Sequence, residues 1–187
     1  MFRILCSLCV FACLFSSCTR IVSTNFPGRA ENNIPADWHG RYIIKFPAAI
    51  SSLEKTNKNN QPIRQYVTIQ ADKIIWDHSP EVSVYSLNDS LVISTVDQEK
   101  YISIKNAQGY YTVIQVKQRG SNLRLFPTYV SKEAGEDDLK PYFDKIKSAG
   151  EAGESYSTYS VKIVDKKLGD YFKSELVERE PVELLRQ

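Results

Sequence analysis

Short runs of alternating hydrophobic and polar residues dominate the chain between residues 34 and 127. A period of two predicts β-strands that bury one face. Turn residues such as Asn88-Asp89 and the stretch from Asn106 to Gly109 separate the runs, and such short connections favour antiparallel neighbours. The hydrophobic positions of the runs are Tyr42, Ile44, Phe46; Val67, Ile69; Ile74, Trp76; Val82, Val84; Leu91, Ile93; Ile102, Ile104; Ile114, Val116; Leu123, Leu125.

After residue 134 the hydrophobic period lengthens to that of a helix. Leu139, Tyr142, Phe143 and Ile146 are three and four positions apart, which predicts an amphipathic helix with Asp138 as its N-cap. The spacing Leu-x-x-Tyr-Phe recurs at residues 168–172. Either two short helices pack a similar apolar face, or the segment is duplicated. Strands are expected at residues 159–163 and 182–185.

These patterns predict an α+β fold that is mostly antiparallel β. We expect a meander or barrel-like sheet of about eight strands, with one or two short C-terminal helices. Such a sheet can curl into a barrel or cover its hydrophobic face with a helix. The single β-rich globular domain is expected over residues 34–187, with its α-containing part at the C-terminal end.

The first eighteen residues have the order of an export signal. A positive charge at Arg3 precedes the apolar run Ile4 to Phe15, and Ser16-Ser17-Cys18 follows. A membrane-spanning helix is the rival interpretation, but it needs roughly 20 apolar residues. We therefore expect residues 1–17 to be a cleaved signal peptide.

The sequence Leu14-Phe15-Ser16-Ser17-Cys18 resembles the lipobox of bacterial lipoproteins. The resemblance implies cleavage before Cys18 and attachment of lipid to its thiol, whereas an ordinary secretory signal would leave the residue bare. Thr19 at the next position implies the outer membrane, facing the periplasm. Residues 18–33 are then expected to be the lipidated cysteine and a flexible tether.

Composition removes several classes of protein. The four cysteines all lie in the first eighteen residues, so the expected mature chain has neither a disulfide framework nor a cysteine zinc site. Lysine and arginine total 24 against 22 acidic residues, a net charge of +2. Nucleic-acid binding lacks its usual positive field. No cofactor is expected.

The segment Trp38-His39-Gly40-Arg41-Tyr42 resembles the Trp-x-Gly-x-Tyr start of the first strand in small lipocalin-like bacterial lipoproteins. The resemblance implies a barrel-like module that binds or packs, without inherited catalytic residues. A tryptophan at that place can plug one end of a barrel. The alternative is a core tryptophan at the start of an ordinary strand.

The two histidines, His39 and His78, are each near an aspartate, Asp37 and Asp77 respectively. Neighbouring residues of a strand point to opposite faces, so Asp77 and His78 do not easily share one ion. We expect solvated polar residues at turns and strand ends, and no metal site.

The usual catalytic motifs are absent from the sequence, including the Gly-x-Ser-x-Gly elbow and His-Glu-x-x-His. The acidic residues 136–138 are interpreted as the start of a helix. We therefore expect no enzyme, but a membrane-anchored envelope lipoprotein that acts as an interaction or binding module for an envelope protein partner. A lipocalin-like carrier of a small apolar ligand is the alternative, and a carboxylate-based envelope hydrolase is the third hypothesis.

Overall fold

The computed structural model describes residues 19–47, 64–78, 81–130, 134–149, 158–177 and 180–187. The strands of its first half are β1 (Thr19–Ser23), β2 (Arg29–Ala30), β3 (Gly40–Lys45), β4 (Tyr66–Ile69), β5 (Lys73–Asp77), β6 (Val82–Ser86) and β7 (Leu91–Val96). The later strands are β8 (Glu99–Lys105), β9 (Tyr111–Arg119), β10 (Asn122–Pro127), β11 (Tyr129–Val130), β12 (Phe143–Ser148), β13 (Thr158–Ile163) and β14 (Val182–Arg186). The helices are the 3-10 helix η2 (Ala36–Trp38) and the α-helices α2 (Glu136–Leu139) and α3 (Asp165–Lys173).

Within the described residues, one sheet contains fourteen strands, and ten of them follow the order β12-β13-β1-β9-β10-β14-β3-β4-β5-β6. A branch leaves this order at β9, where β8 pairs with β9, β7 with β8 and β2 with β7. Most pairs are antiparallel, whereas β1 and β13 are parallel. The predicted mostly antiparallel class is confirmed, but the expected number of about eight strands is too low.

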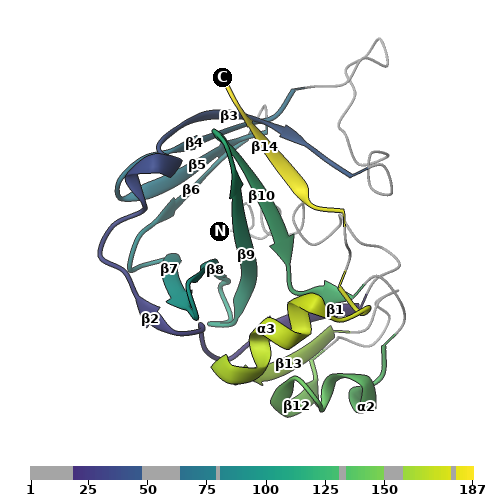
Figure 1. The fold of residues 1–187 in the computed structure, drawn as a ribbon. Helices are drawn as coiled ribbons and strands as arrows, with labels where there is room; N and C mark the ends of the chain where they lie inside the picture. The colour runs from purple at the N-terminus through teal and green to yellow at the C-terminus, as the bar shows by residue number, and fades with distance from the viewer. Residues whose placement is uncertain (1–18, 48–63, 79–80, 131–133, 150–157, 178–179) are drawn as a thin grey trace.

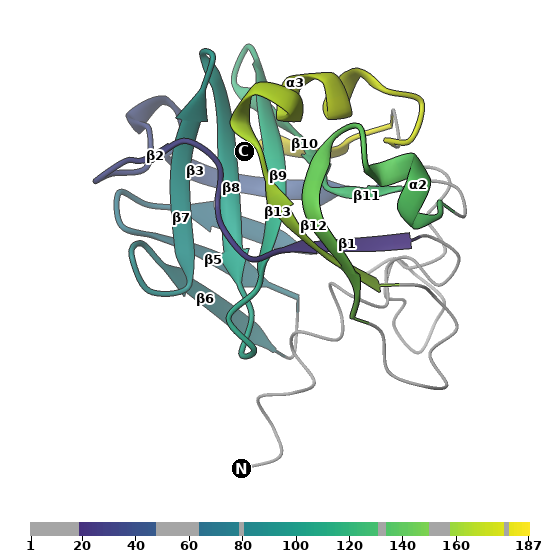
Figure 2. The ribbon, with the colours of Figure 1, turned by 90° about the horizontal axis from the view of Figure 1, so that it is seen from below.

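The sheet curls into a half-barrel. Figure 1 shows the curl, and Figure 2 shows β7, β8 and β9 in front of β3, β5 and β6, which run across behind them. The C-terminal strand β14 joins the two parts, because it pairs with β10 on one side and with β3 on the other. The two parts of the sheet therefore curve around one interior, into which both contribute side chains.

The predicted meander is confirmed in part: β3 to β6 and β7 to β10 each pair with the next strand along the chain, but among the described strands β6 does not pair with β7, so two four-stranded meanders replace a continuous one. Between β7 and β8 the connection is two residues long, and Asp97 and Gln98 have φ angles of 46° and 70°. Positive φ at both positions matches the right-handed twist of a hairpin. Asn88 has a φ of 66° and donates its backbone N–H to the Leu91 carbonyl at 2.8 Å.

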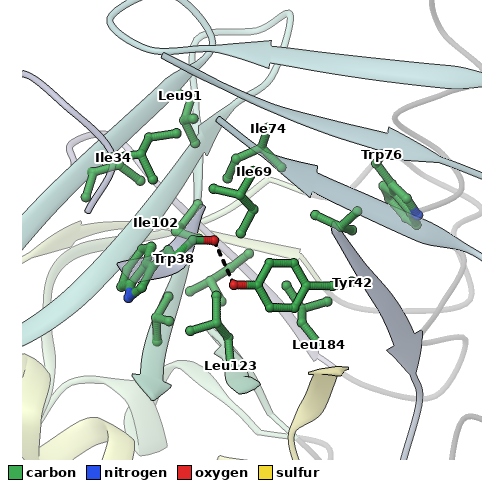
Figure 3. Close-up of a cluster of buried hydrophobic side chains, with 14 residues drawn as sticks. Ile34, Trp38, Tyr42, Ile69, Ile74, Trp76, Leu91, Ile102, Leu123 and Leu184 are labelled. Atoms are coloured by element: carbon green, nitrogen blue, oxygen red, sulfur yellow. Dashed lines mark hydrogen bonds between the residues drawn. The ribbon is translucent and has the colours of Figure 1, made fainter. Parts of the chain in front are cut away.

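A first hydrophobic core fills the concave side of the half-barrel. Side chains from β3, β4, β5, β7, β8, β9, β10 and β14 meet there with the residues that precede β3 (Figure 3). Its buried members are Ile34, Trp38, Tyr42, Val67, Ile69, Ile74, Trp76, Leu91, Ile93, Ile102, Ile114, Val116, Leu123 and Leu184.

A second core lies between α3 and the strands β12, β13, β1, β9 and β8. Leu168 and Tyr171 bring α3 into it, and both are fully buried. Tyr101 of β8 faces this second core, whereas its neighbour Ile102 faces the first. The β8–β9 hairpin is therefore a wall shared by the two cores, because successive side chains of a strand point to opposite faces.

The expected flexible tether over residues 18–33 is wrong for the residues that the structure describes. Thr19–Ser23 is strand β1, which pairs with β13, β11 and β9. Ile21 is 1% exposed and belongs to the second core. The segment contains Asn25, Pro27 and Gly28, which favour loops, and this composition hid a short strand that tertiary pairing stabilises.

The expected helix around residues 138–146 is also wrong. Helix α2 ends at Leu139, and the chain continues as β12 from Phe143, antiparallel to β13. A register shift between Asp144 and Lys147 explains the misleading spacing, because a bulge brings Phe143 and Ile146 to one side of the strand. The second helix predicted from the same spacing is confirmed as α3, and strands β13 and β14 are confirmed too.

Candidate functional site

An apolar cavity of about 70 Å³ lies on the concave side of the half-barrel. Its walls come from β3, β4, β5, β6, β8, β9, β10 and β14, so both layers contribute. The lining residues are Ile44, Phe46, Val67, Ile69, Ile74, Trp76, Tyr85, Ile102, Ile104, Ile114, Leu125, Pro127, Val182 and Leu184.

At the end of the half-barrel where β3 begins, the interior is filled by core side chains that do not line the cavity. There Trp38 and Tyr42 are buried, and the Tyr42 hydroxyl donates a 2.7 Å hydrogen bond to the Trp38 carbonyl oxygen, drawn as the dashed line in Figure 3. The expectation that a tryptophan at this place can close one end of the curl fits this geometry. Burial raises the pKa of the Tyr42 phenol above 10.0.

The other end of the cavity is bordered by side chains that remain partly exposed. Ile44, Ile104 and Leu125 are half-buried there. Trp76 is oriented by its indole N–H, which donates to the Gln65 side-chain oxygen at 3.1 Å. Tyr85 shares this wall, and burial raises the pKa of its phenol.

The chemistry of this cavity is that of hydrophobic contact. All of its lining side chains are aliphatic, aromatic or proline, and none carries a carboxylate, an amine or an imidazole. A cavity of about 70 Å³ is smaller than the roughly 150 Å³ space that holds benzene in an engineered protein core. The cavity therefore has room for one end of an apolar molecule, while the remainder would lie at the half-exposed border.

His78 is buried, so the expectation of a solvated strand end is wrong for this residue. Its ring packs edge-on to Trp76 with centroids 5.1 Å apart. Nε2 lies 3.3 Å from the Ser83 hydroxyl oxygen, and Nδ1 lies 3.8 Å from a carboxylate oxygen of Glu81. These contacts hold His78 at the end of β5, close to the cavity wall that Trp76 forms.

The structure does not bring the two histidines together. His39 precedes β3, and one of its ring nitrogens lies 3.0 Å from the Ile34 carbonyl oxygen. Because β3, β4 and β5 pair antiparallel in sequence, His39 and His78 lie at opposite ends of these strands. No group of three or more His, Cys, Asp or Glu residues that could hold a metal ion occurs in the part of the chain that the structure describes.

The acidic residues 136–138 begin helix α2, as the sequence predicts, but the N-cap is Gly135 and not Asp138, which lies in the first turn. The carboxylate of Asp138 accepts a 2.8 Å hydrogen bond from the backbone N–H of Gly135 and so caps the helix from inside its first turn. Asp137 pairs with Lys140 at 2.7 Å, and this hydrogen bond lowers the pKa of the Asp137 carboxyl. The contacts of Asp137 and Asp138 therefore stabilise helix α2.

Cys18, the predicted lipidation site, lies outside the described residues. The next residue, Thr19, is the first of β1 and is buried. Its hydroxyl oxygen accepts a hydrogen bond from the Ala134 backbone N–H at 3.3 Å. The described part of the chain contains no helix with the length and hydropathy of a membrane span.

Sequence patterns could not predict the cavity. Alternation shows which residues share a face of the sheet, but not how tightly their side chains pack in the interior. Comparison of the chain with protein-family models, curated proteins and solved structures finds no match.

Proposed function

We propose that this protein is a non-enzymatic lipoprotein of the bacterial envelope, anchored through Cys18, whose half-barrel binds a small apolar group. The observation that carries the binding function is the exclusively apolar lining of the cavity between the two layers. The anchor is supported by the resemblance of residues 14–18 to a lipobox.

The size and shape of the cavity support a short ligand. A straight alkyl segment of a few carbons gains about 0.8 kcal/mol for each CH₂ that it buries. Three or four buried carbons then correspond to a dissociation constant in the roughly millimolar range. Ile44, Ile104 and Leu125 are half-buried residues of the lining, so the ligand is expected to enter past them.

Titration with 1-hexanol, followed by NMR of isoleucine methyl groups, tests the binding function. Saturable shifts are expected at Ile44 and Ile104, which line the cavity. Ile21 and Ile163 belong to the second core and serve as internal controls that should not respond. Equal shifts in both sets, or none at the cavity, would contradict the proposal.

Two substitutions that each introduce a phenylalanine sharpen this test. Ile104→Phe adds volume at the cavity border and is expected to abolish the saturable shifts at Ile44. Val84→Phe adds more bulk on β6, where Val84 is 52% exposed, and should leave binding intact. Circular dichroism establishes that both variants are folded before they are compared.

The anchor is tested separately with two cysteine substitutions in the leader. Cys18→Ser should abolish incorporation of labelled fatty acid and release the protein from the membrane fraction. Cys13→Ser alters a cysteine five positions earlier and should leave both unchanged. Fatty-acid labelling of the Cys18→Ser protein would overturn the anchor without touching the binding proposal.

The exposed edge strand β6 also favours a second role, the binding of a partner protein. Among the described strands, β6 ends the main strand order and pairs with β5 alone, and its Val82 and Val84 are 58% and 52% exposed. An exposed edge of this kind can accept an extended segment of a partner protein. A photo-crosslinker at residue 84 should then capture a partner in the native envelope, whereas one at residue 117 on β9 should not.

A further inference from the structure

A second, polar pocket of about 340 Å³ lies on the side of β1 and β13 that faces away from α3. Ile21 and Val161 point to the second core beneath α3, so the alternating residues of the same strands point to the pocket. Its lining comes from β1, β12, β13 and the β8–β9 turn: Arg20, Val22, Asn106, Gln108, Tyr110, Lys147, Ser148, Ala149, Thr158 and Ser160.

The strand register fixes how the pocket residues are arranged. Arg20 is paired with Thr158 across β1 and β13, and Lys147 is paired with Ser160 across β12 and β13. Arg20 and Lys147 are therefore two strands apart and displaced by two residues along the sheet. Their Cα atoms are about 12 Å apart, from a strand spacing of about 4.8 Å and a rise of about 3.4 Å per residue.

The β8–β9 turn forms a pre-organised wall of the pocket. The side-chain oxygen of Asn106 accepts the backbone N–H groups of Gln108 at 3.0 Å and Tyr110 at 2.9 Å. Gly109 adopts a φ of 86°, which the turn requires and most side chains resist. Since the turn is fixed by its own hydrogen bonds, Gln108 and Tyr110 are held at the pocket before any ligand arrives.

The charges of the pocket are of one sign. Arg20 and Lys147 are its ionised groups, and no carboxylate is among the lining residues that the structure describes. Thr158 and Ser160 lie between them and are 8% and 6% exposed, with Ser148 nearby. Two cations that flank a row of hydroxyls form a favourable environment for an anion that also carries hydroxyl groups.

We propose that this pocket binds a phosphate group carried on a polyol, such as glycerol phosphate or a sugar phosphate. Arg20 and Lys147 contact the phosphate oxygens, and the hydroxyl and amide side chains bind the polyol. The volume exceeds what the phosphate alone needs and leaves room for the polyol. The same chemistry occurs in soluble phosphate esters and in the headgroups of membrane lipids, and Arg20 comes two positions after Cys18.

The soluble source is tested by calorimetric titration of the full chain carrying Cys18→Ser with glycerol 3-phosphate. Arg20→Gln and Lys147→Gln should each weaken binding about 10-fold, the loss expected for one charge-assisted hydrogen bond. Lys166→Gln makes the same charge change on an exposed residue of α3 outside the pocket and should bind like the parent protein.

The membrane source is tested by sedimentation of the same proteins with vesicles of phosphatidylcholine, with or without phosphatidylglycerol. Preference for the phosphatidylglycerol vesicles that is lost in Arg20→Gln and Lys147→Gln, but kept in Lys166→Gln, supports a lipid headgroup as the ligand. The proposal is overturned if neither probe binds, or if Lys166→Gln weakens binding as much as the pocket variants. Thermal unfolding of each variant establishes that it is folded.

Discussion

The hydroxyl of Tyr42 donates a 2.7 Å hydrogen bond to the carbonyl oxygen of Trp38, four residues earlier in the chain. Tyr42 is fully buried, and the Trp38 side chain is 3% exposed. The bond ties the 3-10 helix η2 to the first residues of β3 and closes one end of the half-barrel. A buried carbonyl that depends on a single side chain is sensitive to the loss of that partner.

Tyr42→Phe is expected to lower the free energy of unfolding by about 1–3 kcal/mol, because the Trp38 carbonyl loses its donor in a dry environment. Urea denaturation measures the change. Tyr66→Phe removes a hydroxyl from a half-buried tyrosine whose ring lies 4.3 Å from the Arg41 guanidinium, and should cost less than about 0.5 kcal/mol. Equal losses of unfolding free energy in the two variants would show that the hydrogen bond to Trp38 contributes no more stability than the Tyr66 hydroxyl does.

Ile21→Ala tests whether β1 belongs to the fold. The side chain is 1% exposed in the second core, so its truncation is expected to cost about 2–5 kcal/mol. Arg29→Ala changes an exposed residue of the short strand β2 and should stay within about 0.5 kcal/mol. If Ile21→Ala were as neutral as Arg29→Ala, the segment would behave as the tether that the sequence predicted.

Gly28→Ala should be more destabilising than Gly109→Ala, although both glycines have positive φ angles. A Cβ at Gly109, where φ is 86°, would meet no atom within 4 Å, so the cost is the backbone strain of about 1–2 kcal/mol. At Gly28, where φ is 63°, a Cβ would lie 2.2 Å from the Thr95 carbonyl oxygen. The added clash is expected to cost about 1–3 kcal/mol more, measurable by thermal unfolding.

The stability of the protein should fall steeply with pH above 10. Burial raises the pKa of the Tyr101 phenol from 10.0 to about 12. Between these pH values the unfolded chain releases the proton while the folded chain keeps it, so rising pH favours unfolding. Tyr101→Phe should therefore show a shallower fall of unfolding free energy between pH 10 and 12, and equal slopes would contradict the assignment.

The strands of the meander were predictable because their alternation survives in the sequence even where both faces are buried. In β8, Ile102 and Ile104 face the first core, and they alternate with Tyr101 and Ser103, of which Tyr101 belongs to the second core. Polar or amphipathic residues on the second face kept the period of two visible. A strand with apolar residues on both buried faces would show a continuous hydrophobic run instead of this alternation.

The errors arose where long-range pairing overrides local pattern. Residues 139–146 have a helical spacing, but a bulge in β12 produces the same distribution of Phe143 and Ile146 by another geometry. Thr19–Ser23 is a strand because β13 and β9 accept it, and both partners lie far along the chain. The local sequence contains no signal for such a distant partner.

The candidate sites were partly foreseeable. The Trp38-to-Tyr42 segment was singled out as the start of the first strand of the curled sheet, and the structure places both aromatic side chains in the first core. The sequence does not predict the polar pocket, because Arg20 falls in the expected tether and Lys147 directly after the expected helix. The register of β1, β13 and β12 brings their residues to one face, and register is a property of the folded sheet.

The place of β14 between β10 and β3 bears on how the polypeptide matures during its synthesis. Residues 182–186 follow both of their partner strands along the chain, yet they supply the hydrogen bonds that connect the two halves of the curl. Until they arrive, β3 and β10 each present an open edge, and open edges attract other nascent chains. Completion of the native state must therefore wait until β14 has been synthesised, and removal of these five residues should be far more harmful than their number implies.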